Sequence, residues 1–236
     1  MIDVRDLHKT FEGANVLRGV DLSIAKGQSL VLIGASGSGK SVLLKCILGL
    51  ETPDRGTITV DGQPAHPPKF LDRFGMLFQG AALFDGMRVW ENVAFRPLQS
   101  GMARDKARAL AIEKLDRVGL SAATADQFPS ELSGGMQKRA GLARAIATDP
   151  EIIFFDEPTT GLDPIRAGQI NALIREVVDD LGATTLTITH DMTSVRAIAD
   201  NVAFLKDGRI DWAGKPKEMF DIDQPDLKAF ITGTPI

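Results

Sequence analysis

Short runs of apolar and β-branched residues, each bounded by turn residues, recur along the chain and predict β-strands. They lie at residues 2–4, 20–24, 29–33, 57–60, 76–78, 152–155, 185–189 and 202–205. The runs 29–33, 152–155 and 185–189 are almost uninterrupted, as in strands covered on both faces. These three runs predict a parallel centre. The shorter early runs, joined by turn sequences such as Asp61-Gly62, favour an antiparallel layer.

Helical periodicity appears between these strands. From 104 to 118 apolar residues recur every three or four positions, and Gly119 follows where a helix would end. Asp163-Pro164 predicts a helix start, with a buried stripe running to Leu181 before Gly182. Residues 85–149 contain no long strand pattern. The chain is therefore predicted to be one α/β domain over 1–236, with core segments 1–84 and 150–236 and a helical segment at 85–149.

Composition and charge narrow the class of protein. The chain is 44% hydrophobic and 25% charged, as in ordinary globular domains. Its net charge of −4 argues against a surface that coats nucleic acid. No apolar run reaches the roughly 18 residues needed to span a bilayer, and the first residues are acidic, unlike a signal peptide. Together with a single cysteine, Cys46, these features predict a cytoplasmic protein.

A glycine-rich segment follows the strand predicted at 29–33. It reads Gly34-Ala35-Ser36-Gly37-Ser38-Gly39-Lys40-Ser41 and matches G-x-x-x-x-G-K-[ST]. In such a segment, backbone N–H groups surround nucleotide phosphates, the lysine places a charge near the β- and γ-phosphates, and the hydroxyl of Ser41 is offered to Mg²⁺. Val42, the next residue, is included in the predicted nucleotide site.

Polar side chains also follow three other predicted strands. Gln79 follows 76–78, Asp156 and Glu157 follow 152–155, and His190 follows 185–189. Because ligands bind beyond the carboxyl ends of parallel strands, these residues are expected at one site with the glycine-rich loop. Asp156 would hold Mg²⁺, Glu157 would orient the attacking water, and His190 would contact the γ-phosphate. Gln79 would reach Mg²⁺ or the water.

Each of these residues also has a plainer interpretation. The two carboxylates could form a solvated turn, His190 could cap a helix or lie in the core, and Gln79 could be an ordinary loop amide. Phe11, on the loop expected after the first strand, could stack on adenine with support from Val16, or it could be core material.

Two helix starts add further candidates. Asp163 could cap its helix, contact a second subunit, or do both. Ser133, Gly134 and Gly135 open a helix at Met136 and could simply be its start. They could also form a second nest of donors for a γ-phosphate, a nest for which one subunit has no evident use.

The order of these motifs along essentially the whole chain resembles the ATP-binding cassette (ABC) ATPases. The resemblance implies a RecA-like parallel-sheet core, an antiparallel β layer and a helical subdomain. It also implies ATP and Mg²⁺ as cofactors, Glu157, His190 and Gln79 as catalytic residues, and Ser41, Gln79 and Asp156 as metal ligands. Family members pair head to tail, so a homodimer would use the Ser133 to Gly135 nest. Met136 and Phe11 depart from the commonest residues, glutamine and tyrosine.

A finer resemblance is to the ATPase subunit of Mla/Mce-type lipid transporters. It rests on residues 74–84 and 89–95, the signature 132–136, the segment 161–164 and, more weakly, 226–233. It implies phospholipid transport between the inner and outer membranes, at the cytoplasmic face of the inner membrane. The expected partners are a permease gripped through about 80–95, a periplasmic Mce-domain component and a small regulatory subunit. The candidate grip residues are Leu83, Phe84, Trp90 and Phe95.

Three other functions are weighed against the same motifs. A methionine or polar amino-acid importer would share the catalytic residues and differ mainly after Gln79. A soluble ABC protein acting in DNA repair or translation is disfavoured by the single cassette and the weakly acidic balance. A nucleotide sensor without turnover is disfavoured because Glu157 and His190 are both present.

Overall fold

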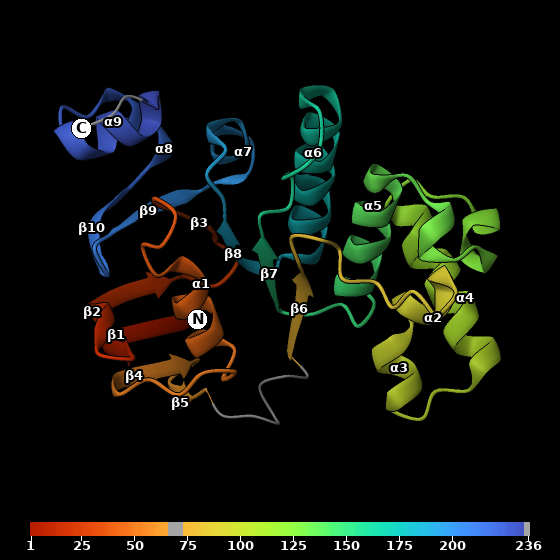
Figure 1. The fold of residues 1–236 in the computed structure, drawn as a ribbon. Coiled ribbons are helices and arrows are strands. Elements are labelled where there is room, and N and C mark those ends of the chain that lie inside the picture. Colours follow the sequence, from red (N-terminus) through yellow and green to blue (C-terminus); the bar gives the residue numbers. More distant parts are fainter. Residues whose placement is uncertain (66–72, 234–236) are drawn as a thin grey trace. The chain divides into compact units, whose positions relative to one another are not determined.

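The computed structural model describes residues 1–65 and 73–233, and its backbone is drawn in Figure 1. The chain divides into two compact units. Unit 1 comprises Met1–Asp72 and Thr184–Ile236, and unit 2 comprises Arg73–Ala183. The segment 85–149, all of which is described, contains helices and no strand, and it lies within unit 2.

An antiparallel sheet forms the first layer of unit 1. Its strands are β1 (Ile2–Phe11), β2 (Ala14–Ile24), β4 (Arg55–Val60) and β5 (Gln63–Pro64), in the order β2-β1-β4-β5. The antiparallel layer expected from the early runs is thus confirmed. Strands β1 and β2 are much longer than their apolar runs because polar residues occupy their exposed positions. They meet at a tight turn in which Glu12 and Gly13 have φ of 47° and 85°.

A second set of strands in unit 1 positions the glycine-rich loop. Strand β3 (Ser29–Ile33) lies between β8 (Thr184–Ile188) and β9 (Asn201–Lys206) and is parallel to both, and β10 (Arg209–Gly214) pairs antiparallel with β9. All five residues of β3 and of β8 are buried, as their uninterrupted character predicts. The helices of this unit are α1 (Lys40–Ile47), α7 (Met192–Ile198), α8 (Pro216–Asp221) and α9 (Pro225–Thr232).

Unit 2 combines two parallel strands with most of the helices. Strand β6 (Phe74–Leu77) pairs with β7 (Ile152–Asp156). The helices are α2 (Val89–Val93), α3 (Phe95–Gln99), α4 (Arg104–Arg117), α5 (Gly134–Ala145) and α6 (Pro164–Leu181). Helices α4 and α6 have almost the predicted bounds. Gly182 ends α6 in the left-handed conformation, as expected.

Strand β6 and helix α5 approach each other at Gly75. A Cβ at this position would lie 1.9 Å from the carbonyl oxygen of Ala145, so only glycine allows the strand to lie this close to the end of the helix. Beside it, the rings of Phe74 and Phe154 pack edge to face with centroids 5.3 Å apart. The close approach at Gly75 holds α5 against the strand that leads to Gln79, and the ring pair holds that strand to β7.

Cys46, in α1, is the only cysteine of the chain and is buried. Burial raises the pKa of its thiol to about 11, so the thiol is protonated at neutral pH.

Among the described residues, no helix combines the length and apolar character required to cross a membrane.

We expect Gly75→Ala to lower the free energy of unfolding by about 2 to 3 kcal/mol, because the added methyl group must displace the backbone of α5. Denaturant unfolding measures the change. Gly86→Ala is the matched control, since a Cβ there meets no atom within 4 Å. Equal stability of the two variants would contradict the close packing of β6 on α5.

Candidate nucleotide site

The glycine-rich loop connects the carboxyl end of β3 to the first residue of α1 in unit 1. Its first glycine is fixed by packing: a Cβ on Gly34 would lie 2.3 Å from the carbonyl oxygen of Leu205 and 2.8 Å from Oγ of Ser38. Ala35, Ser36 and Gly37 are exposed. The loop therefore lies flat on β9 with its outer side open.

Two features of this loop fit a phosphate ligand. Lys40 folds back over the loop, where its Nζ donates to the carbonyl oxygens of Gly34 at 2.7 Å and Ala35 at 2.8 Å. The Oγ of Ser38 is buried and has no hydrogen-bond partner among the described residues. A cation over the loop and a buried hydroxyl without a partner are both suited to phosphate oxygens. Ser41 and Val42 follow in the first turn of α1, where N–H groups are unsatisfied.

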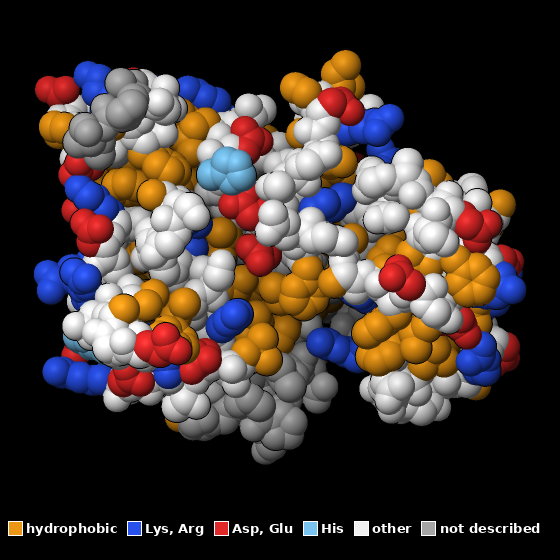
Figure 2. All heavy atoms as spheres, viewed as in Figure 1, with side chains coloured by type: hydrophobic (Ala, Val, Ile, Leu, Met, Phe, Trp, Pro, Cys, Tyr) orange, Lys and Arg blue, Asp and Glu red, His pale blue; other side chains and the backbone are white. Residues whose placement is uncertain are grey.

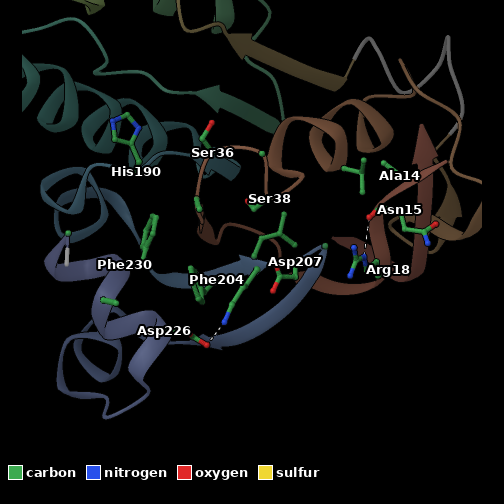
Figure 3. Close-up of a pocket in the computed structure, with 18 residues that line it drawn as sticks. Ala14, Asn15, Arg18, Ser36, Ser38, His190, Phe204, Asp207, Asp226 and Phe230 are labelled. Carbon is green, nitrogen blue, oxygen red and sulfur yellow. Dashed lines mark hydrogen bonds and ion pairs between the residues drawn. The ribbon is translucent and has the colours of Figure 1, made fainter. Parts of the chain in front are cut away.

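His190 lies two residues beyond β8, the parallel neighbour of β3. Its side chain is exposed, and the cap of α7 is supplied instead by Asp191, whose carboxylate accepts from the N–H groups of Thr193 and Ser194 at 2.9 and 3.0 Å. His190 is therefore neither a helix cap nor a core residue. It lines a cavity of about 870 Å³ together with Ser36 and other residues of the glycine-rich loop (Figure 3).

The far wall of this cavity comes from segments that the motifs did not reveal. The end of β9 contributes Lys206, the turn after it contributes Asp207, and α9 contributes Asp226 and Phe230 (Figure 3). Helix α9 is held to β9 by an ion pair between Lys206 and Asp226, and the rings of Phe204 and Phe230 lie 5.4 Å apart. Only the resemblance of 226–233 to a lipid-transporter tail had pointed to this region.

Of the two residues predicted to contact adenine, only one lines the cavity. Val16 lines the cavity, whereas Phe11 is not among its lining residues. Phe11 is the last residue of β1, not part of a loop after it, because the first strand continues beyond its apolar run. Its side chain is 39% exposed, and the ammonium of Lys9 lies 5.0 Å from the ring centroid. Stacking on adenine remains a prediction.

The carboxylates belong to unit 2. Asp156 is the last residue of β7, and Glu157 follows it with a left-handed φ of 48°, which is uncommon for a residue with a side chain. The hydroxyl of Thr160 donates to Oε2 of Glu157 at 3.1 Å, and the N–H of Thr160 donates to the Glu157 carbonyl oxygen at 3.3 Å. These bonds hold the turn just beyond the strand.

Gln79 lies at the same end of the parallel pair β6 and β7, in the turn after β6. Its side chain is exposed. The Nζ of Lys138, from α5, donates to the carbonyl oxygens of both Gln79 and Glu157. Burial lowers the pKa of Lys138, and the nearby carboxylates of Asp156 and Glu157 oppose that shift. Two of the four predicted strand ends therefore lie together in each unit. Unit 1 holds the glycine-rich loop and His190, and unit 2 holds Gln79 and the carboxylates that follow β7.

The signature segment begins α5. Ser133 is the N-cap, and its Oγ accepts from the N–H of Met136 at 3.4 Å. Gly134 and Gly135 do not have positive φ, and added Cβ atoms would have no neighbour closer than 3.9 Å. Neither backbone strain nor packing requires glycine here. What the two glycines provide is uncovered N–H groups at an exposed helix start.

Asp163 caps α6, as predicted. Its Oδ1 accepts from the N–H groups of Ile165 at 3.1 Å and Arg166 at 3.0 Å. Its side chain is exposed, so capping leaves it accessible at the surface.

Of the four candidate grip residues, Trp90 requires correction. It is 5% exposed, and the guanidinium of Arg104 lies 4.9 Å from the ring centroid, so it belongs to the core of unit 2. Phe84 is 45% exposed and packs against Phe95 with ring centroids 4.8 Å apart. Hydrophobic side chains gather over α2 and α3 (Figure 2). Leu83 is partly exposed.

A buried amide that sequence reasoning missed organises this segment. Asn92 accepts from the N–H of Phe84 at 2.6 Å and donates to the carbonyl oxygens of Phe84, Met87 and Arg88 at 3.1 to 3.2 Å. One side chain thus holds the loop that presents Phe84.

Comparison with known proteins identifies the family. A family model described as ABC transporter matches residues 17–160. The probable ribonucleotide transport ATP-binding protein mkl of Mycobacterium leprae is 38% identical over 98% of this chain and 69% of its own length. HisP of Escherichia coli, a histidine/lysine/arginine/ornithine transport ATP-binding protein, is 36% identical over 99% of this chain and 97% of its own. The methionine import ATP-binding protein MetN of Caulobacter vibrioides is 42% identical over 93% and 68%.

Solved structures agree. A dimeric, post-hydrolysis state of the ATP-binding cassette MJ0796, bound to ADP and Pi, matches with a TM-score of 0.83 and 29% identity over 92% of this chain and 99% of that one. This chain spans 66% of the length of the mkl proteins of Mycobacterium bovis and Mycobacterium tuberculosis. The chain belongs to the ABC transporter family and has the fold of its ATPases, as predicted. It is an ATP-binding and ATP-hydrolysing protein.

We expect Gly34→Ala to weaken ATP binding by about 10- to 100-fold, because the methyl group must push the loop off β9 at a cost of about 1 to 3 kcal/mol. Titration with a fluorescent ATP analogue measures the affinity. Gly168→Ala, at a position where a Cβ meets nothing within 4 Å, should leave the affinity unchanged. Unchanged binding by Gly34→Ala would contradict the role given to the loop's packing.

Proposed function

We propose that this chain is the ATPase subunit of a transporter that moves phospholipid between the inner and outer membranes. In this proposal it acts as a homodimer on a membrane-embedded permease, at the cytoplasmic face of the inner membrane. The observation that carries the cargo assignment is the resemblance of residues 74–84 and 89–95 to Mla/Mce-type ATPases. Exposed Phe84, on a loop held by Asn92, packs against partly exposed Phe95 at the start of α3.

The nucleotide is proposed to bind through the glycine-rich loop of unit 1. Lys40 would exchange the carbonyl oxygens of Gly34 and Ala35 for phosphate oxygens, and Ser38 would gain the partner it lacks among the described residues. Mg²⁺, held by Ser41, Gln79 and Asp156, would neutralise charge on the β- and γ-phosphates. A hydroxyl, an amide and a carboxylate form an all-oxygen donor set, which suits this hard cation.

Hydrolysis is assigned to three strand-end residues. Glu157 orients the attacking water as base or positioner, and its carboxylate is itself held by the hydroxyl of Thr160. His190 contacts the γ-phosphate, a role supported by its position on the cavity beside the glycine-rich loop. Gln79 senses the nucleotide through Mg²⁺ or the water, which an uncharged amide can engage and leave without a large desolvation cost.

The second donor nest is the argument for a dimer. The backbone N–H groups of exposed Gly134 and half-buried Gly135, with the hydroxyl of Ser133, would cover the γ-phosphate bound by the other subunit. Asp163 would meet the partner beside them. A relative that is dimeric when bound to ADP and Pi supports the proposal of a dimer. Closure around two ATP molecules would then drive the permease.

Further partners follow from the lipid assignment. A periplasmic Mce-domain component would carry the lipid between membranes, and a small regulatory subunit would bind the ATPase. Both rest on the resemblance of the chain to this branch of the family.

A second candidate is the ATPase of a methionine or polar amino-acid importer. It is favoured by relatives named for methionine, arginine and histidine/lysine/arginine/ornithine transport, at 36% to 42% identity. These proteins share the ATPase machinery, so the machinery alone does not separate the two cargoes.

We expect Glu157→Gln to bind ATP normally and to lose nearly all steady-state hydrolysis, because the amide cannot accept the proton or polarise the water. Phosphate release measures turnover, and size-exclusion chromatography with ATP should reveal an accumulated dimer. Substantial turnover in this variant would refute the role assigned to Glu157.

The cargo and the grip surface can be tested together by isolating the tagged chain from membranes. Mass spectrometry should identify a permease, a periplasmic Mce-domain protein and bound phospholipid. Phe84→Ser should reduce recovery of the permease while leaving hydrolysis by the isolated ATPase unchanged. Leu50→Ser, which alters a 66% exposed leucine of unit 1, is the matched control and should retain the permease.

The outcomes separate the two candidates. Recovery of a solute-binding protein instead of an Mce-domain protein would replace the lipid assignment with the amino-acid one. Normal recovery of the permease with Phe84→Ser would remove this residue from the grip surface whatever the cargo.

A further inference from the structure

We propose that Lys138 is a positioning residue for ATP hydrolysis. Its ammonium group ties the backbone of Gln79 and of Glu157 to the signature helix α5, so that the three segments move as one body. The proposal rests on the catalytic roles proposed above for Gln79 and Glu157. All of its contacts lie within unit 2.

The position of Lys138 is unusual for a lysine. Its side chain is only 5% exposed, although lysine is almost never buried without a partner. It donates to two backbone carbonyl oxygens, those of Gln79 and of Glu157, the latter at 3.4 Å, and the carboxylates of Asp156 and Glu157 are near it. One ammonium group therefore joins the turn after β6 to the turn after β7, and both turns to α5. Lys138 lies two residues after Met136, the end of the signature, in the same helix.

The turn at Glu157 needs such support. Glu157 has a φ of 48°, a conformation that persists in a residue with a side chain only where its surroundings hold it. The bonds from Lys138 and from the N–H of Thr160 both end on the Glu157 carbonyl oxygen. They fix the peptide that sets where the carboxylate points. Loss of the ammonium would let this peptide relax and move the carboxylate away from the water.

A second cation of α5 holds the other side of the Gln79 turn. The guanidinium of Arg144 donates to the carbonyl oxygens of Ala81 and Ala82, both at 2.6 Å. These two alanines have φ of 60° and 49°, so this turn is also strained. Between the two cations, Gly141 lets the helix lie against the turn, since a Cβ there would be 3.2 Å from the Cβ of Ala81.

Residues 138, 141 and 144 recur every third position and so lie along one side of α5. This side of the helix meets residues 79–82 along their length. A displacement of the signature segment would therefore reach Gln79 through Lys138 and Arg144, and Glu157 through Lys138. Binding of a γ-phosphate at the start of α5 would therefore change the positions of the turns at Gln79 and Glu157.

A purely structural role for Lys138 would have a different signature. Lys114 provides the comparison: it is 3% exposed, lies in α4 of the same unit and pairs with Asp149 at 2.7 Å and Glu113 at 3.4 Å, neither of which is a predicted site residue. If burial of a lysine is all that matters, Lys138→Met and Lys114→Met should act alike. If positioning matters, only the first should affect catalysis beyond its effect on stability.

The experiment uses the full chain in the assembly that hydrolyses ATP. Lys138→Met, which keeps the apolar stem and removes the donors, should lower kcat by about 10- to 100-fold while the affinity for ATP stays unchanged. Lys138→Arg, which restores a cationic donor, should recover most of the lost rate. Hydrogen exchange should accelerate at residues 79–82 and 157–160 in Lys138→Met but not in Lys114→Met.

Three results would overturn the proposal. They are a wild-type kcat in Lys138→Met, a lower kcat in Lys138→Met with unchanged hydrogen exchange in either turn, and equal losses of kcat in Lys138→Met and Lys138→Arg. Should Lys138→Met fail to fold, Lys138→Gln keeps a neutral donor and is judged by the same measurements. Exchange also separates this proposal from the assigned role of Glu157. If Glu157→Gln keeps turnover, that role fails, while the exchange data still report whether Lys138 holds the two turns.

Discussion

The close approach of one backbone to another, at positions where a side chain would not fit, is the constraint on which the rest of this structure depends. At Gly34 the phosphate loop lies so close to β9 that an added Cβ would be 2.3 Å from the carbonyl oxygen of Leu205. At Gly75 an added Cβ on β6 would be 1.9 Å from the carbonyl oxygen of Ala145 in α5. In each unit the strand that leads to a functional loop is thereby pressed against its neighbour. The loops start from a fixed base, although they are irregular themselves.

Close packing of irregular loops creates clusters of carbonyl oxygens that need donors, and this chain meets the need with long cationic side chains. Lys40 covers the carbonyl oxygens of the phosphate loop, and Lys138 and Arg144 cover those of the turns beside Gln79 and Glu157. In unit 1 the cation belongs to the helix that the loop begins, and a phosphate can compete for it. In unit 2 the cations come from α5, where Lys138 is buried and Arg144 is partly buried, and their bonds support the turns.

Much of this organisation was predictable, and what was not has a physical reason. Strands buried on both faces carry an unbroken apolar run, and so β3 and β8 were found at almost their true bounds. Strands with one exposed face alternate with polar residues, and β1 was therefore recognised only at its first residues. The motifs located the loops, but the buried roles of Asn92 and Lys138 depend on which backbone groups lie opposite them. Trp90 was misassigned because an apolar residue beside a loop has the same pattern whether it faces a partner or the core.

The lone, buried thiol of Cys46 has a practical consequence. With a pKa of about 11, it stays protonated and shielded at neutral pH, where exposed thiols react readily with maleimides and disulfide cross-linkers. The unmodified chain therefore has no readily reactive thiol that would take up a thiol-directed spectroscopic label. A cysteine placed at the start of α5 or on the phosphate loop would be the only reactive one. Distances between the two units, and between two copies of the chain, become measurable without first altering the helix that follows the phosphate loop.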